Sequence, residues 1–446
     1  MKFQPPKGTR DLLPEDANKL HKIIEICRTV FEKYGFEPLI TPAFESFELL
    51  SAKGGLGEAV KDEIYYFKDK SDRELGLRFD LTMPLARVVS STSLPKPFKR
   101  YAIDKVWRYD NPAFLRFREF WQADIDVIGS NNMLSDVECV SAVCEILDSL
   151  GFKNYFIRVN SRKLLQNEFE RIVKKDELIE VFRTIDKLDK IGLEGVEEEL
   201  KKKNLEPKNI LKILKTENLK DVPDNEGKKE LIEFFSLAKK LGIDKKLKFD
   251  ISLVRGLEYY TSVVFEVNLG AKVSCGGGGR YDNLIKNIGG QDLPATGISL
   301  GLDRILEVMK ENKMSKTEKT NTKVFVANVD NNVIDDAVKI VQQLRKNGIN
   351  SQMDLMGRSF GKQLEYASNS QIPYVVIVGR DEAKKKTFKL KDMKTGKQRN
   401  LALKNIISQL LKMEKTNVTK DILGSLKGWK INTQKALDKL DREEDG

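Results

Sequence analysis

Three arginines gather around a turn between two segments whose residues alternate as in β-strands. Arg108 lies near the end of the first segment, PFKRYAIDKVWRYD. After a turn at Asn111 and Pro112, Arg116 directly precedes the second segment, FREFWQADIDVIG, and Arg118 lies at its start. This alternation predicts an antiparallel hairpin. Because a planar guanidinium can donate two hydrogen bonds to a phosphate, arginines grouped in this way could bind a nucleotide. An ordinary basic hairpin has the same sequence, so the pattern alone leaves both interpretations open.

A further arginine stands within an apolar and aromatic segment. In LVRGLEYYTSVVFEV, Arg255 precedes Tyr259 and Tyr260, and the alternation predicts a strand in the interior of a sheet. An arginine without a partner is unfavourable there. The segment therefore predicts that Arg255 meets an anion.

Glycines and a fifth arginine follow. Four consecutive glycines at 276–279, in SCGGGGRYDNL, lie between strand-like segments. Without side chains, they allow a flat ligand or another backbone to approach closely, although a loose turn is the alternative. GISLGLDRILEVMK then predicts a strand that runs into a helix, with Arg304 at the start of the helix.

The composition excludes several other kinds of chemistry. His21 is the single histidine, so a His-based triad and an H-E-x-x-H zinc site are ruled out. We expect it on the surface of a helix. The four cysteines, Cys27, Cys139, Cys144 and Cys275, form no C-x-x-C pair and are expected to be reduced core residues without a metal. Neither G-x-x-x-x-G-K-[ST] nor G-x-G-x-x-G opening a helix is present. Chemistry must therefore depend on arginines, carboxylates, tyrosines and backbone amides, with or without a metal ion.

The elements that position these residues can be outlined from the sequence. Helical spacing of apolar residues predicts helices over 14–34, 83–91 and 135–150. ELGLRFDLT reads as a strand, and PLITPAFES as a strand at a sheet edge, because Pro42 interrupts it. Residues 163–245 are rich in Leu, Lys and Glu at helical spacing and look like a helical insertion.

A polar stretch, ENKMSKTEKTNTK, marks the expected domain boundary. After it, strands and helices alternate, which predicts a small α/β domain. The net charge of +11 fits a polyanionic partner such as RNA. The start of the chain lacks the apolar segment of a signal peptide, and no apolar run is long enough for a membrane span, so we expect a cytoplasmic protein.

Taken in order, these segments resemble a known family. RYAIDKVWRYDNPAFLRFREF resembles motif 2 of class II aminoacyl-tRNA synthetases, GISLGLDRIL resembles motif 3, and GFEPLITPAFES resembles motif 1. LVRGLEYYTSVVFEV and SCGGGGRYDNL resemble two signatures of the histidyl-tRNA synthetase family. SFGKQLEYASNSQIPYVVIVG and LKDMKTGKQ are similar to its anticodon-binding domain. The resemblance extends from Pro6 to about Lys412.

The resemblance implies a fold and an activity. Residues 1–320 would form a class II catalytic domain on an antiparallel sheet, with the helical insertion, and 323–412 an α/β anticodon-binding domain. Residues 413–446 form a polar, helix-leaning tail of unknown role. The implied reaction activates L-histidine with ATP and esterifies it to the 3′ end of tRNA-His. The family also implies a homodimer with motif 1 at the interface.

Roles for the arginines come with the resemblance. Arg108 would hold the α-phosphate of ATP, and Arg255 would bridge that phosphate to the histidine carboxylate, where negative charge builds up during activation. Arg304 would hold the γ-phosphate and cover one face of the adenine, with Phe120 on the other. Mg²⁺ would be carried on the β and γ phosphates. The implied ATP site comprises Arg108, Arg116, Arg118, Phe120, Gly301 and Arg304.

The implied histidine site is polar at both ends of the substrate. Asp126 and Tyr260 would bind the two ring nitrogens. Asp80, Thr82 and Gln122 would bind the α-amino group, and Asp80 and Thr82, two residues apart in RFDLT, are expected on one face of a strand. The whole set comprises Asp80, Thr82, Gln122, Asp126, Tyr259 and Tyr260.

Some residues depart from the family pattern. The turn DNPAFLRFREF lacks a glycine and is shorter than expected, which leaves open how the tRNA acceptor end is read. Glu258, Ser262 and Asp303 stand where Asp, Gly and Glu are usual. KMSK at 313–316 resembles the lysine loop of class I synthetases, but that class also needs a His-x-Gly-His element, so we interpret KMSK as linker.

Three alternatives keep the same ancestry but differ in function. A regulatory subunit of ATP phosphoribosyltransferase would sense histidine without activating it, but would lack the domain after residue 320 and Arg255. An RNA-binding adaptor would have no need for Arg108, Arg255 and Arg304 together. A third possibility is another amino-acid specificity within class II. Histidine-dependent pyrophosphate exchange separates all of these.

Overall fold

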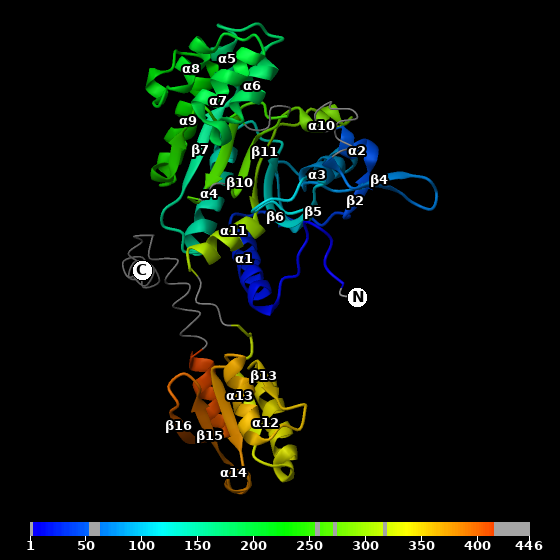
Figure 1. The fold of residues 1–446 in the computed structure, drawn as a ribbon, viewed down its shortest axis with the longest axis vertical. Coiled ribbons are helices and arrows are strands. Elements are labelled where there is room, and N and C mark those ends of the chain that lie inside the picture. The colour runs from blue at the N-terminus through cyan, green and yellow to red at the C-terminus, as the bar shows by residue number, and fades with distance from the viewer. Residues whose placement is uncertain (1–2, 53–62, 255–258, 271–273, 315–318, 414–446) are drawn as a thin grey trace, which may run out of the picture. The chain divides into compact units, whose positions relative to one another are not determined.

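The computed structural model describes residues 3–52, 63–254, 259–270, 274–314 and 319–413. The chain divides into two compact units, one of residues 1–11 and 22–314 and the other of 12–21 and 315–446. Figure 1 shows the elements of each unit. No helix in the described ranges is long and apolar enough to cross a membrane.

A large sheet organises the first unit. Its strand order is β1-β5-β6-β11-β10-β9-β7-β8, and every neighbouring pair from β5 to β7 is antiparallel. β1 and β8 add to the two edges in parallel, so the sheet is mixed rather than purely antiparallel. The strands are β1 (Glu37–Pro38), β5 (Phe98–Trp107), β6 (Glu119–Ile128), β7 (Phe156–Ser161), β8 (Leu247–Phe249), β9 (Val263–Asn268), β10 (Gly276–Arg280) and β11 (Ala295–Gly301).

Further helices and a small second sheet accompany the large sheet, and the first turns of α1 belong to the second unit. α1 (Pro14–Lys33) has Pro14 at its start and acidic residues in its first turn, where the helix dipole favours them. α4 (Met133–Ser149) begins where Asn132 accepts the Leu134 amide hydrogen, and it is buried along most of its length. The remaining elements are β2 (Phe44–Ser46), α2 (Phe47–Ser51), β3 (Tyr66–Lys68), β4 (Glu74–Leu77), α3 (Thr82–Ser91), α10 (Leu284–Asn287) and α11 (Leu302–Glu311).

The predicted insertion at 163–245 is helical, as expected. Figure 1 shows α5 to α8 gathered together in green. α9 and α5 also contact β7 and β9, and α9 packs against α4 as well, so these two helices cover part of the large sheet. The helices are α5 (Arg162–Phe169), α6 (Leu178–Ile185), α7 (Leu188–Lys202), α8 (Pro207–Leu214) and α9 (Glu226–Lys240).

Three sequence predictions about strands were wrong in extent. RFDLT is not a strand, because β4 ends at Leu77 and α3 begins at Thr82. The strand predicted through Tyr259 and Tyr260 begins only at Val263. Conversely, the glycines at 276–279 do not separate strands but form β10 themselves.

The second unit contains a five-stranded sheet among its described residues, in the order β13-β12-β14-β15-β16. The predicted alternation is confirmed for β12 (Val324–Asn328), α12 (Ile334–Lys346), β13 (Ser351–Met353), α13 (Phe360–Asn369) and β14 (Tyr374–Val378). A short helix and an antiparallel hairpin were not predicted: α14 (Arg380–Lys385), β15 (Thr387–Asp392) and β16 (Gln398–Ala402). A further helix runs over 403–413, and the tail beyond it lies outside the described residues.

The lone histidine and the cysteines lie where the sequence predicts. His21 is exposed on α1. The four cysteines are buried and free. Burial raises the pKa of Cys27 to about 12 and that of Cys275 to about 11, so both thiols are protonated at neutral pH.

Candidate active site

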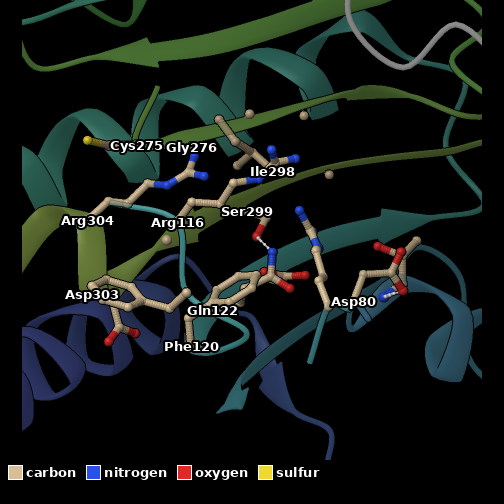
Figure 2. Close-up of a pocket in the computed structure, with 18 of the residues that line it drawn as sticks. Asp80, Arg116, Phe120, Gln122, Cys275, Gly276, Ile298, Ser299, Asp303 and Arg304 are labelled. Atoms are coloured by element: carbon tan, nitrogen blue, oxygen red, sulfur yellow. Dashed lines mark hydrogen bonds between the residues drawn. The ribbon is translucent and has the colours of Figure 1, made fainter. Parts of the chain in front are cut away.

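A pocket of about 530 Å³ opens over the middle of the large sheet. β6, β10 and β11 form its floor, and the segment before α3, the β5–β6 connection and the start of α11 form its walls. Figure 2 shows Arg304 and Arg116 toward one end and Asp80 toward the other. Eleven residues predicted from the sequence line it: Asp80, Thr82, Arg108, Arg116, Phe120, Gln122, Asp126, Tyr259, Tyr260, Gly301 and Arg304.

Arginines make one end of the pocket cationic. Arg108 follows β5 directly, donates from Nε to the Phe79 carbonyl oxygen at 3.1 Å, and lies 5.2 Å from the centroid of the Phe120 ring. Arg304 donates from Nε to the Leu115 carbonyl oxygen at 3.0 Å, which ties the start of α11 to the β5–β6 connection. Arg116, from that connection, pairs with Asp110 at 3.0 Å. These guanidinium groups come from three separate segments.

One predicted and described site residue is not brought together with these. Arg118 does not line the pocket; it donates to the carbonyl oxygens of Asp110 and Lys7 and lies 4.8 Å from the Tyr109 ring centroid. Residues two apart on a strand point to the same side, but Arg118 lies just before β6. Its side chain therefore does not join that of Phe120 in the pocket. Arg255 and Glu258 lie outside the described residues.

The opposite end of the pocket is acidic. The Asp80 carboxylate accepts the amide hydrogens of Thr82, at 3.2 Å, and Met83, at 3.0 Å. These amides are the ones that a helix start leaves without intrahelical partners, so Asp80 fixes the beginning of α3. Asp80 and Thr82 thus meet through a helix start, not through one face of a strand.

Two polar side chains of β6 are fixed by neighbouring strands. Gln122 donates from Nε2 to Ser299 Oγ on β11 at 2.8 Å. Asp126 is 3% exposed; Arg100 of β5 lies 2.7 Å from its Oδ2, and Tyr281 donates a hydrogen bond to its Oδ1. A buried carboxylate with a cation and a donor is held in one orientation.

The tyrosine segment that closes the pocket is anchored from outside. The ring centroids of Tyr259 and Tyr260 lie 4.2 Å apart. Thr261 next to them donates to Asp282 at 2.9 Å, and Ser262 donates to Glu230 of α9 at 2.7 Å. Ser262, which departs from the family pattern, therefore supplies a link to the insertion.

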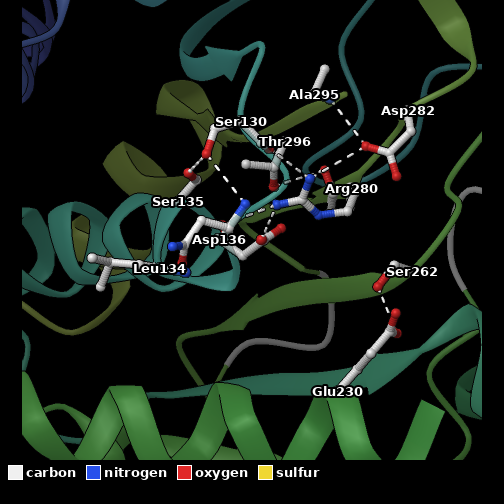
Figure 3. Close-up of polar contacts among 12 residues, drawn as sticks. Ser130, Leu134, Ser135, Asp136, Glu230, Ser262, Arg280, Asp282, Ala295 and Thr296 are labelled. Atoms are coloured by element: carbon white, nitrogen blue, oxygen red, sulfur yellow. Dashed lines mark hydrogen bonds and ion pairs between the residues drawn. The ribbon is translucent and has the colours of Figure 1, made fainter. Parts of the chain in front are cut away.

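Figure 3 shows the polar cluster behind this segment. Arg280, at the end of β10, is 5% exposed and forms an ion pair with Asp136 of α4. It also donates to the Ser130 carbonyl oxygen at 2.9 Å and pairs with Asp282 at 3.3 Å. The Arg280 carbonyl in turn accepts the Thr261 amide hydrogen at 2.7 Å. This cluster ties β10 and α4 to the segment that carries the two tyrosines.

Glycines shape the floor. A Cβ built on Gly278 would lie 2.1 Å from the Gly297 carbonyl oxygen, and one built on Gly297 would lie 2.1 Å from Asp126 Oδ1. The prediction of a close backbone approach at 276–279 is confirmed, and the approaching backbone is that of β11 at Gly276 and Gly278 and that of β9 at Gly279.

Asp303, another departure from the family pattern, connects motif 3 to motif 2. It is 5% exposed, accepts the Trp121 amide hydrogen at 2.7 Å and pairs with Arg10 at 2.8 Å. It therefore holds the first turn of α11, and with it Arg304, against β6.

Sequence reasoning missed several lining residues. Asp124 follows Gln122 and precedes Asp126 at strand spacing, so alternation along β6 could have identified it. Tyr281 and Ser299 contact predicted residues but come from strands whose pairing is not local. Asp186, from the end of α6, gave no signal. All four line the pocket.

Burial keeps the tyrosines of the pocket neutral. Burial raises the pKa of Tyr259, and that of Tyr281 well above its usual value, helped for Tyr281 by the neighbouring Asp126. Both hydroxyl groups are therefore hydrogen-bond donors at physiological pH. The pocket combines cationic groups at one end with carboxylates and neutral donors at the other, which suits a polyphosphate and a cationic substrate placed end to end.

Comparisons with known proteins agree with this geometry. A family profile described as Histidyl-tRNA synthetase matches residues 8–305, and one described as Anticodon binding domain matches residues 323–413. The histidine-tRNA ligase of Nanoarchaeum equitans is 39% identical over 405 residues, covering 90% of this chain and 97% of that protein. The ligase of Aeropyrum pernix is 40% identical over 397 residues, covering 85% and 91%.

Solved structures give the same answer. The histidyl-tRNA synthetase of Nostoc sp. PCC 7120 superposes with a TM-score of 0.82 at 31% identity, over 93% of this chain and all of that one. A Bacillus halodurans structure described as an ATP phosphoribosyltransferase regulatory subunit/histidyl-tRNA synthetase has a TM-score of 0.71 at 21% identity and shows the fold alone; it covers 85% of this chain and 99% of that one. With matches to both of its family domains and to relatives along most of its length, the chain belongs to the histidyl-tRNA synthetase family.

Proposed function

We propose that the pocket described above carries out the family's known activity, the ATP-dependent activation of histidine to histidyl-adenylate followed by transfer to tRNA-His. The observation that carries this proposal is one pocket lined by both arginines and carboxylates, with Arg304 and Arg116 toward one end and Asp80 toward the other. Histidine-dependent exchange of pyrophosphate into ATP tests it. A folded protein that showed no exchange would instead be a histidine sensor, an RNA-binding relative or a class II enzyme with another amino-acid specificity.

In this proposal the cationic end binds ATP. Arg108 holds the α-phosphate, Arg304 the γ-phosphate, and Phe120 lies against the adenine. Arg108 already lies against the Phe120 ring, so one short stretch of the hairpin would serve both phosphate and base. Arg116 and the Gly301 backbone complete the site. Arg255 keeps its proposed role between the α-phosphate and the histidine carboxylate.

Mg²⁺ fits this site as an ion bound mainly by ATP. In the part of the chain that the structure describes, no group of three His, Cys, Asp or Glu side chains is arranged to hold a metal ion. Asp303, the carboxylate next to Arg304, already pairs with Arg10 and accepts from Trp121. When bound, the ion would neutralise charge on the β and γ phosphates.

The acidic end binds histidine. Asp80, Thr82 and Gln122 receive the α-amino group, and Asp126 and Tyr260 bind the ring, with Tyr259 beside it. Since Gln122 pairs with Gly301 and Asp126 with Gly297 along β11, the ring would lie farther from the phosphates than the amino group does. This order places the histidine carboxylate toward the α-phosphate, as activation requires.

Asp126→Asn should weaken histidine far more than ATP. The Asn side chain would leave a ring nitrogen of histidine poorly matched in a buried site, which should weaken histidine binding by about 1 to 3 kcal/mol. This corresponds to an increase of roughly 5- to 150-fold in the KM for histidine. Pyrophosphate exchange at varied histidine and varied ATP measures both constants.

The same substitution leaves Arg100 without its carboxylate partner, which can destabilise the fold. A cooperative thermal melt of the variant must therefore accompany the kinetics. If the folded variant binds histidine as the parent does, the ring contact lies elsewhere.

The second proposal concerns a division of labour along the chain. We assign residues 1–320 to the catalytic domain and 323–412 to anticodon binding, where Arg358, Lys362 and Lys384 are among the basic residues. A protein that ends near Thr320 should retain histidine-dependent exchange within about tenfold yet charge tRNA-His poorly. Losing phosphate contacts should also flatten the salt dependence of tRNA binding by roughly one log unit of slope per contact.

Truncation can simply unfold the protein, so a cooperative melt of the shortened chain comes first. Filter binding and charging of tRNA-His at several salt concentrations then give the comparison with the full chain. Equal charging by the two proteins would remove the anticodon role from residues 323–412.

Assembly and location are also proposals. Large apolar side chains are exposed near motif 1: Ile40 is 88% exposed, Phe44 51% and Phe67 38%. Exposed apolar side chains that gather on a surface often mark an interface. Phe44 and Phe67 have their rings 6.3 Å apart. We propose that this surface joins two copies of the chain in a homodimer, which sedimentation equilibrium would test. We also propose that the protein works in the cytoplasm with tRNA-His.

A further inference from the structure

Asp124 is a buried carboxylate in the pocket for which the family resemblance implied no role. It lies in the middle of β6, is 3% exposed and lines the pocket. Its Oδ1 has no hydrogen-bond partner among the residues that the structure describes. Buried polar atoms are almost always hydrogen-bonded, because an unsatisfied one loses its contact with water without compensation. A ligand that brings a donor to Oδ1 would satisfy it.

The position of Asp124 along the strand indicates which part of the substrate it meets. Gln122, Asp124 and Asp126 point to the same face of β6, and residues two apart on a strand are separated by about 6.5 Å. Gln122 is assigned to the α-amino group and Asp126 to the ring. Asp124 stands between them, within reach of the ring nitrogen nearer to Cα.

The two carboxylates nearest to Asp124 already have protein partners. Asp126 is held by Arg100 at 2.7 Å and by the Tyr281 hydroxyl. Asp80 is engaged by the amides of α3. Asp124 lines the pocket, and its buried Oδ1 has no hydrogen-bond partner among the described residues, a condition that it shares with Gln122 Oε1 on the same strand.

The surrounding charges favour a donor that carries positive charge or can share it. The net effect of its surroundings raises the pKa of Asp124 to about 7. Burial is the largest cause of this rise and Asp126 and Asp80 contribute to it, whereas Arg100 and a hydrogen bond from Ser299 lower the pKa. A free carboxylate is thus unfavourable in the empty pocket. An N–H group of the substrate would stabilise the ionised form.

We propose that Asp124 is a specificity-determining residue that accepts a hydrogen bond from an imidazole N–H of histidine. The inference rests on the proposed placement of histidine in this pocket. The imidazole has two nitrogens, so Asp124 shares one of them with Asp126, and Tyr260 keeps the other. Asp126, fixed by Arg100 and Tyr281, orients the ring, and Asp124 requires an N–H donor on it. A substrate with an apolar side chain would leave the Asp124 carboxylate buried without a partner, which such sites reject strongly.

Asp124→Asn tests this assignment with two ligands. The first is histidine, and the second is imidazolepropionate, which keeps the ring and the carboxylate but lacks the α-amino group. The KM for histidine and the competitive inhibition constant of imidazolepropionate are measured by pyrophosphate exchange on the full-length protein. Both should rise by about 10- to 100-fold, the range for losing a hydrogen bond to a charged group, while the KM for ATP changes less than about threefold.

The pair of ligands separates the ring from the amino group. If Asp124 binds the amino group, the substitution weakens histidine but leaves imidazolepropionate unchanged, and the proposal fails. It fails equally if neither constant changes. If Asp124→Asn has no effect while Asp126→Asn weakens histidine, only the role of Asp124 is lost; if neither substitution matters, histidine does not bind in this pocket at all.

Stability distinguishes binding from a structural role. Asp124 is crowded by Asp126 and Asp80, so Asp124→Asn should melt at the same temperature as the parent or higher. Asp124→Ser, which is smaller, provides a second variant with the same expected ligand pattern. Glu138→Gln is the matched control: Glu138 pairs with Lys99 at 2.5 Å, does not line the pocket, and should leave both constants unchanged. A drop in melting temperature with equal losses for histidine and ATP would show that Asp124 supports the fold instead.

Discussion

Arg108→Ala is expected to lower the rate of histidine-dependent pyrophosphate exchange by about 10²- to 10³-fold, the usual effect of removing one group that stabilises charge in a transition state. Arg108 lines the pocket next to Phe120, and its Nε is already oriented by the Phe79 carbonyl oxygen. The guanidinium is therefore in place before the substrates bind. Most of the loss should appear in the exchange rate at saturating substrates, with a smaller change in the KM for histidine.

Arg118→Ala is the matched comparison for this effect. Arg118 belongs to the same hairpin, but its guanidinium donates to the Asp110 and Lys7 carbonyl oxygens and does not line the pocket. We expect a loss of less than about tenfold. Equal losses in the two variants would mean that the Arg108 effect comes from general disturbance of the hairpin, and exchange at the parental rate in Arg108→Ala would remove its assignment to the α-phosphate.

Gly278→Ala is expected to have the largest effect on stability. The new Cβ would lie 2.1 Å from the Gly297 carbonyl oxygen and 2.6 Å from the Ile298 Cα. Both atoms belong to the backbone of β11, so β10 and β11 would have to separate in the middle of the sheet. We expect a loss of at least about 3 kcal/mol in the free energy of unfolding, the upper end for an overpacked core, measured by urea denaturation.

Gly361→Ala serves as the control for that substitution. Gly361 lies in the first turn of α13, and nothing stands within 4 Å of its added Cβ. Its stability should change by less than about 1 kcal/mol, in the stabilising direction that helix propensity gives. If Gly278→Ala is as stable as Gly361→Ala, the close approach of β10 and β11 is not a fixed feature of the fold.

Local sequence patterns were sufficient to place Arg108 and Arg304 at the pocket. Arg108 and Arg304 each lie next to a long, regular element, the β5–β6 hairpin and the β11–α11 transition, so the pattern that predicts the element also places the residue. The direction of the Arg118 side chain could not be predicted. Arg118 lies just before β6, and its guanidinium is oriented by hydrogen bonds to the Asp110 and Lys7 carbonyl oxygens. Alternation holds only within the strand.

The parts of the site that could not be predicted from the sequence depend on contacts between distant segments. Alternation in RFDLT suggested a strand, but the Asp80 carboxylate stabilises a helix start there through the Thr82 and Met83 amides. A short sequence cannot show which of these two local structures the surrounding fold favours. Likewise, the partners of Asp126 come from β5 and from the end of β10, more than 150 residues away in the case of Tyr281.

The four glycines of β10 make this strand weak in isolation and dependent on its two neighbours. A glycine loses more conformational freedom on folding than any other residue, at roughly 0.5 to 1 kcal/mol each relative to alanine, so four in succession oppose strand formation by about 2 to 4 kcal/mol. β10 has little side-chain packing of its own to offset this entropy, and it depends on backbone hydrogen bonds to β9 and β11 on both sides. A strand this weak in isolation can exist only in the middle of a sheet, where both neighbours hold it, and its order follows theirs.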